Sequence, residues 1–186
     1  MMSILPEPRD RNLPGWASDI RDTDTSWMEV AQKGVDGFVA HAMAKKVSFA
    51  RETVFSHWRE RPDGSIESKI GQIVEMQAAG YFVLLLFVGL SNWPLSIGRV
   101  QRRVQQGGPA VDPEKLIARF GRTQKAIREA AKVADATILL DNSRTQREAF
   151  TVCRVQLKEQ IEFDLRNREA AIPKEIAAWL DVVSPR

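Results

Sequence analysis

Residues 81–90, YFVLLLFVGL, form an apolar run bounded by Gly80 and Gly89, and the rest of the chain is interpreted outward from it. A run of about eight apolar residues with β-branched and aromatic members, flanked by glycine, is typical of a strand buried on both faces. Such strands belong to parallel sheets covered by helices, and ligands bind just beyond their carboxyl ends. The sequence therefore predicts a binding site directly after this run.

Two basic helices are predicted after the run. The first begins near Pro94, a residue suited to a first helical turn, and ends at the Gly107-Gly108 pair. The second begins at Pro113 and continues to about Val133. Both carry guanidinium side chains close to the predicted ligand position: Arg99, Arg102, Arg103, Arg119 and Arg122.

Composition limits the classes of protein to which the chain can belong. The 186 residues suit one domain, and an apolar content of 44% with 27% charged residues is ordinary for a globular protein. A net charge of +3 gives no reason to expect a nucleic acid partner. The single cysteine, Cys153, fits a reducing, cytoplasmic setting. We expect no signal peptide and no membrane segment, because the longest apolar run falls well short of the ~20 residues required.

The remaining segments predict alternating helices and strands. Residues 1–15, with three prolines, are expected to form a loose arm. Helices are expected from Ser26 to about Lys46, from Ile66 to Ala79, and from Pro173 to Val183. Strands are expected at 47–54 and at 136–140, and a β-hairpin at 149–163. This alternation predicts βαβ units and an α/β fold with a parallel sheet.

Four blocks in this order resemble the zeta-toxin-like P-loop kinases, which phosphorylate small substrates such as UDP-sugars. SFARETVFS resembles the family's strand that ends in an E-T or E-G-T motif, and AAGYFVLLLFVGL resembles its central strand. LSIGRVQRRVQQGGPAVDPEKLIARFGRT resembles its lid segment, of the form RVxxRVxxGGHxVPxxxIxxRxxRS, and VADATILLDNS its last core strand. The resemblance covers residues 17–145 and leaves 1–16 as an arm and 146–186 as a C-terminal hairpin and helix. It implies a three-layer parallel sheet of P-loop kinase type, with ATP and Mg²⁺ as cofactors.

The chain departs from this family at three places. The phosphate loop GxxxxGK[ST] is absent, because the nearest stretch, DGSIESKIG, lacks the second glycine directly before Lys69 and follows no strand. Relative to the family the sheet is therefore expected to be N-terminally truncated. Pro109 replaces the histidine that follows the family's double glycine, and Val54 stands in one alignment where the family has threonine, with Thr53 next to it.

The predicted phosphate ligands are Arg99, Arg103 and Arg119. Arg99 and Arg103 are four residues apart on one helix face, so both can point at one anion. The resemblance assigns Arg103 and Arg119 to the two lid positions that contact ATP phosphates. Guanidinium groups suit this role because they are planar and always charged. The alternative is an ordinary solvated basic face.

The remaining candidates come from the resemblance. It implies that Glu52, with Thr53 beside it, binds the hydroxyls of the sugar substrate; the alternative for Glu52 is a carboxylate that caps the next turn. It implies that Asp19, in ASDI, is the catalytic base, although Asp22 and Asp24 compete and all three could be plain helix caps. Asn142 and Ser143 would flank the adenine, or form an ordinary turn.

Two functions remain open at this point. The first is a zeta-toxin-type ATP-dependent kinase, with a nucleotide, a small-molecule substrate and an antitoxin protein as possible partners. In that case a strand and a phosphate loop would be encoded upstream of Met1. The second is a degenerate relative that binds a nucleotide or a protein without catalysis. Since the anion cradle of the phosphate loop is missing, we expect no ATP turnover from these 186 residues.

Overall fold

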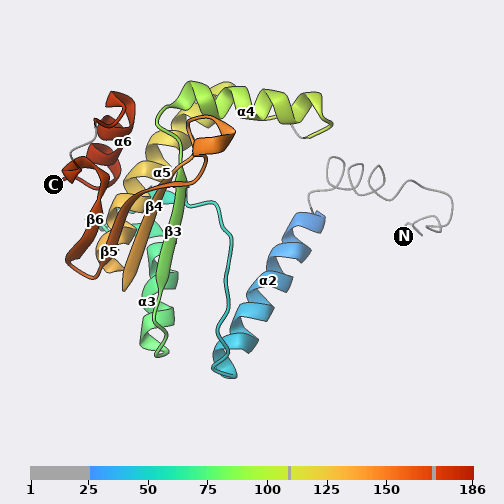
Figure 1. The fold of residues 1–186 in the computed structure, drawn as a ribbon. Helices are drawn as coiled ribbons and strands as arrows, with labels where there is room; N and C mark the ends of the chain where they lie inside the picture. The colour runs from blue at the N-terminus through green and yellow to red at the C-terminus, as the bar shows by residue number, and fades with distance from the viewer. Residues whose placement is uncertain (1–25, 109, 169–170) are drawn as a thin grey trace. The chain divides into compact units, whose positions relative to one another are not determined.

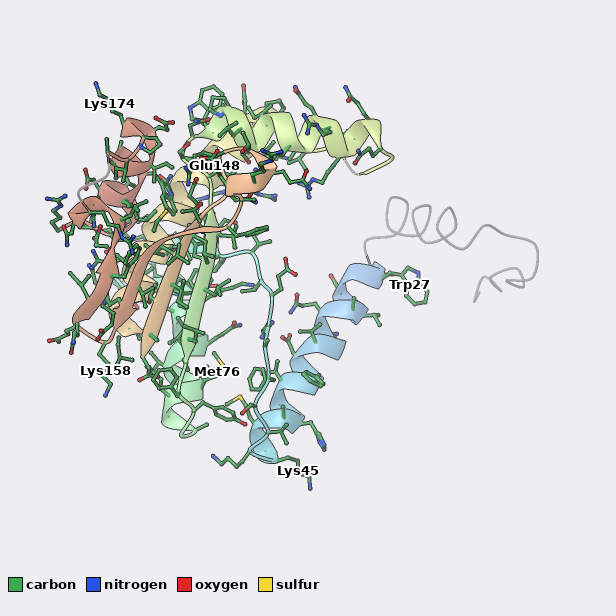
Figure 2. The ribbon with its side chains drawn as sticks, in the orientation of Figure 1. Trp27, Lys45, Met76, Glu148, Lys158 and Lys174 are labelled. Carbon is green, nitrogen blue, oxygen red and sulfur yellow. The ribbon has the colours of Figure 1, made fainter. Side chains whose placement is uncertain are left out.

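A computed structural model describes residues 26–108, 110–168 and 171–186 of the chain. The chain divides into two compact units, Met1–Arg51 and Glu52–Arg186, and each is described by itself. Figure 1 shows the elements of both units, and Figure 2 adds their side chains. The predicted arm and the candidate base Asp19, with its competitors Asp22 and Asp24, lie outside the described residues.

The described part of the first unit is one helix with a short extension. Helix α2 spans Ser26–Ala44, which confirms the helix predicted from Ser26. It carries large apolar side chains that are 44–62% exposed: Trp27, Val30, Val35 and Phe38. After the helix, Arg51 Nη2 lies 2.8 Å from Asp36 Oδ1. The strand predicted at 47–54 is wrong, because the chain has no regular structure there.

The second unit is built on a four-stranded sheet in the order β3-β4-β5-β6 (Figure 1). Strands β3, Leu84–Gly89, and β4, Ala136–Asp141, are parallel. Strands β5, Thr151–Leu157, and β6, Gln160–Asp164, form the predicted hairpin, and β5 runs antiparallel to β4. The expectation of a wholly parallel sheet therefore holds only for the β3–β4 pair among the described strands.

Three helices accompany this sheet and form the core with one of its faces. They are α3, Ile70–Ala78, α5, Pro113–Val133, and α6, Lys174–Val183. In the first core cluster, apolar residues of α5 and α6 pack on β4 and β5: Ile127, Leu139, Cys153, Ile176, Trp179, Leu180 and Val183. In the second, residues of α3 and α5 pack beside β3: Ile73, Val83, Ala130 and Ala134. Burial of these side chains is the main stabilising term of the unit.

The remaining elements lie around the sheet. Strands β1, Trp58–Glu60, and β2, Ile66–Ser68, form a small antiparallel hairpin, so the helix predicted from Ile66 begins only at Ile70. Helix α4, Trp93–Gln105, follows β3 and begins with Pro94 in its first turn, as predicted. Two short 3₁₀ turns, η2, Gln146–Glu148, and η3, Leu165–Asn167, complete the unit.

The prediction that the apolar run 81–90 is buried on both faces is wrong. Strand β3 lies at the edge of the sheet, and its side chains alternate between the core and solvent. Leu84 is 50% exposed and Leu86 is 56% exposed, whereas Val83 belongs to the core. The described chain is thus a mixed α/β protein with one parallel strand pair. Within the described residues we find no helix whose length and apolarity would allow it to cross a membrane.

Candidate functional site

The carboxyl ends of the two parallel strands bring one group of predicted residues together. Gly89 of β3 pairs with Asp141 of β4, and the Asn142 N–H donates to the Gly89 carbonyl at 2.9 Å. One residue further, the Ser91 N–H donates to Ser143 Oγ at 2.6 Å. The loops that follow β3 and β4 are therefore joined at the edge of the sheet where ligands of open α/β sheets bind.

Arg99 reaches this edge from α4. Asn92 caps the helix by accepting the Leu95 N–H at 3.1 Å, and Pro94 fixes the first turn. From the second turn of the helix, the Arg99 guanidinium donates to the Asn142 carbonyl. The structure thus brings Arg99, Asn142 and Ser143 together. The Arg99 guanidinium and the Ser143 hydroxyl both form hydrogen bonds with the loops that follow β3 and β4.

Asp141 organises this group and was not among the predicted site residues. Its carboxylate is fully buried, and Oδ1 accepts the Ser143 N–H at 2.9 Å. Oδ2 lies 3.2 Å from Nε of Arg144, whose guanidinium continues to Glu148 at 2.8 Å. The signal in the sequence was the Asp-Asn-Ser turn at the end of an apolar strand. A buried carboxylate with these partners fixes the loop geometry, because an unpaired charge there would be strongly unfavourable.

A second group surrounds Arg119 on α5. An open pocket of about 550 Å³ is lined by side chains from the β1 region and from α5: Val54, Ser56, His57, Trp58, Arg59, Arg119 and Arg122. Arg119 and Arg122 are three residues apart and so occupy one helix face. Among the described residues, no carboxylate forms an ion pair with Arg59, Arg119 or Arg122. The pocket therefore presents three guanidinium groups whose charge is not neutralised locally.

Trp58 places an indole in the same pocket. Its Nε1 atom is buried and has no hydrogen-bond partner among the described residues. Lys125 of α5 lies 5.0 Å from the centre of the indole ring, a cation–π distance that adds a further positive charge. A buried N–H donor without an acceptor is unfavourable.

The β1–β2 hairpin that carries Trp58 is held by Glu67. Glu67 Oε1 lies 3.1 Å from His57 Nε2, and Oε2 lies 3.1 Å from Arg61 Nη2. Hydrogen bonds from Arg61 and then from His57 lower the pKa of the Glu67 carboxyl. His57 lines the pocket while its ring bonds the Glu67 carboxylate.

The other predicted residues lie elsewhere. Thr53 Oγ1 accepts a hydrogen bond from Lys69 Nζ, and Glu52 beside it is exposed. Arg103 is exposed on α4, and its carbonyl accepts the Gly108 N–H at 2.8 Å. Neither Arg99 nor Arg103 lines the pocket that contains Arg119. The expected single cluster of lid arginines is therefore divided between the strand ends and the α5 pocket.

The described residues include no group of three or more His, Cys, Asp or Glu side chains placed to hold a metal ion. Comparison of the chain with protein-family models, with curated proteins and with solved structures gave no match. The functional argument therefore rests on the two groups of residues just described.

Proposed function

We propose that this chain is a zeta-toxin-like, P-loop-kinase-type domain that binds the phosphates of a nucleotide, without transferring a phosphoryl group in these 186 residues. The observation that carries the proposal is the α5 pocket, where Arg59, Arg119 and Arg122 face one volume of about 550 Å³ with no carboxylate partner among the described residues. Phosphoryl-transfer proteins need cations around the transferring group far more than covalent chemistry.

The chemistry of the pocket suits an organic phosphate. Guanidinium groups bind phosphate oxygens in a planar, bidentate manner and stay charged at any physiological pH. Lys125 adds a cation near the Trp58 indole, and Trp58 lines the pocket. Arg119 was the arginine predicted at the second lid position. The other lid candidates, Arg99 and Arg103, would reach a bound nucleotide only from the strand-end group or from α4.

The strand ends offer a second contact for the same ligand. The loops after β3 and β4 meet at a topologically favoured ligand position, where Asn142 and Ser143 follow the buried Asp141. In the three-layer arrangement of the family, a further parallel strand and its phosphate loop would complete this edge. Under this proposal Glu52 and Thr53 would contact a UDP-sugar type substrate, and an antitoxin protein remains a possible partner.

Turnover is not expected from these residues. The chain contains no GxxxxGK[ST] loop, so the backbone amides and lysine that hold the β- and γ-phosphates are missing. We derive no step through Mg²⁺.

A second candidate function is protein binding without a nucleotide. The apolar side chains that β3 exposes favour it, because soluble monomers rarely show a large contiguous apolar surface. This candidate predicts that ATP and pyrophosphate do not bind at all.

Isothermal titration calorimetry of the full chain with ATP and with pyrophosphate tests the proposal. We expect both to bind, and the double substitution Arg119→Gln with Arg122→Gln to weaken binding by at least about tenfold. Arg128→Gln is the matched control, because Arg128 lies on the same helix and does not line the pocket. If the double variant and the control bind ATP and pyrophosphate with equal affinity, the α5 pocket is not the binding site. Release of ADP by the unmodified chain would contradict only the absence of turnover.

A further inference from the structure

The sheet of the second unit has one face that the core does not use. Side chains of paired residues lie on the same face, so the register places Leu84 with Ala136, Leu86 with Ile138, and Val88 with Leu140. The β4–β5 register continues the same face: it comprises Leu84, Leu86, Val88, Ala136, Ile138, Leu140, Val152, Val155 and Leu157, here called the open face. None of these side chains belongs to the core clusters.

The open face carries no polar or charged side chain on β3, β4 or β5. The face that packs against the helices, in contrast, includes five polar ones: Thr137, Asp141, Thr151, Arg154 and Gln156. The more uniformly apolar face of the sheet is thus the more exposed one. A strand that is apolar on both sides is typical of a sheet that is covered on both sides.

The exposure is large enough to matter. Leu86 is 56% exposed, Leu84 50%, Leu157 45%, Val152 40% and Val88 38%. The alternation extends to Phe82, which is 63% exposed. At roughly 150–250 Å² for a fully exposed large side chain, the open face presents on the order of 600 Å² of apolar surface. That is the upper end of what a soluble monomer normally exposes.

We propose that the open face packs against the open face of a second copy of this chain. Two such faces would bury about 1,200 Å², the lower limit of specific, stable protein interfaces. On β3, β4 and β5 the open face has no charged side chain that would repel its copy. On β6 a charge does lie on this side of the sheet, because Arg168 lies 4.9 Å from the centre of the ring of Phe163, which pairs with Val155. One apolar patch serves both partners of a two-fold interface. Sheets pack face to face in this way, with their strands about 30° apart.

Light scattering coupled to size exclusion, over a range of concentrations of the full chain, tests this inference. We expect a concentration-dependent dimer. Leu86→Lys places a charge at the centre of the open face, opposite its copy, and should weaken dimerisation by at least about tenfold. Val182→Lys is the control, because Val182 is 47% exposed on α6 and lies outside the open face. It should leave the dimer unchanged.

Three results would overturn the proposal. A monomer at all concentrations would do so, since no second copy would then cover the face. A dimer that Leu86→Lys leaves intact would do so as well, because it would use another surface. Equal loss of the dimer in both variants would show a general effect of added lysine. If Leu86→Lys fails to fold, as its circular dichroism would show, Leu86→Gln replaces it under the same criteria.

Discussion

Arg166 and Asp164 form a two-point ion pair beneath the C-terminal helix. Arg166 Nε lies 2.9 Å from Asp164 Oδ1, and Arg166 Nη2 lies 2.6 Å from Oδ2. Their side chains are 2% and 4% exposed. Arg154 approaches the same carboxylate, with Nη1 3.0 Å from Oδ2. One buried carboxylate therefore pairs with two buried arginines where β6 leads into η3.

Asp164→Asn should be among the most destabilising single changes in the second unit. It would leave the buried Arg154 guanidinium without a carboxylate partner and Arg166 with only the exposed Asp181, which is expected to lower the free energy of unfolding by about 3–5 kcal/mol. Chemical denaturation measures this value. Asp181→Asn is the control, because Asp181 pairs with the same Arg166 but is 62% exposed. Its effect should stay below about 1 kcal/mol. Similar losses in the two variants would contradict the importance of burial here.

The same carboxylate predicts a pH dependence. Burial opposes ionisation of Asp164, but hydrogen bonds from Arg166 and the charges of Arg166 and Arg154 outweigh it, and its pKa is lowered. A lowered folded-state pKa contributes stability that is present above the unfolded value of about 3.9 and is lost as the pH falls through the folded pKa. The stability difference between the unmodified chain and Asp164→Asn should therefore shrink below about pH 4 and stay constant from about pH 5 to 7. A difference that does not change at low pH would contradict this.

A glycine at the end of β3 is required by the packing of α6. A Cβ atom at Gly89 would lie 2.3 Å from Cζ2 and 2.8 Å from Cε2 of Trp179, which is 2% exposed in the core. Gly89→Ala should therefore destabilise the unit by about 1–3 kcal/mol, because the indole must move within a packed core. Gly98→Ala, inside α4 with no atom within 4 Å, should instead be neutral or stabilising by up to about 1 kcal/mol. The thermal unfolding midpoints of both variants test this prediction. Equal midpoints for the two variants would refute the close contact between Gly89 and Trp179.

Local sequence patterns predicted most helices and strands of this chain, but they did not predict which faces of these elements are buried. The capping residues and prolines placed α2, α4 and α5 well, because they act on the residues beside them. The apolar run at Leu84–Gly89 was correctly predicted as a strand, but an apolar residue has the same identity on a covered face and on an exposed one. The segment 47–54 has the β-branched composition of a strand, but it does not pair with any strand in the described structure.

The candidate site shows the same limit. The Asp-Asn-Ser turn after β4 indicated a ligand position, and the structure joins it to the loop after β3. The division of Arg99 and Arg119 between two groups depends on how α4 and α5 lie against the sheet, which no local spacing determines. Trp58 and Arg59 were missed for a related reason. They line a pocket with α5 because the β1–β2 hairpin, which Glu67 holds, lies against this helix although it is distant in the sequence.

The thiol of Cys153 should be inert in the folded chain. Cys153 is fully buried in the core, and burial is the main cause that raises the pKa of its thiol to about 11. Because the thiolate is the reactive form, Ellman's reagent at about pH 8 should label it only as fast as the chain opens. Added denaturant should make the reaction immediate. Val182→Cys supplies an exposed thiol that should react at once. Rapid labelling of the unmodified chain without denaturant would contradict the burial.

Asp135 joins β3 to the segment that leads into β4, and its removal should loosen the start of β3. Its Oδ2 accepts the Val83 N–H at 2.8 Å and Gln77 Nε2 at 3.1 Å. The bond from Val83, followed by that from Gln77, lowers the pKa of the carboxyl. Asp135→Ala should destabilise the unit by about 1–3 kcal/mol, because the Val83 amide loses its acceptor. Hydrogen exchange at the Val83 amide should accelerate much more than at Ile127, a core residue of α5. Gln77→Ala is the matched control, since it removes a partner of Asp135 but keeps the bond to Val83, and there the exchange of the Val83 amide should change little.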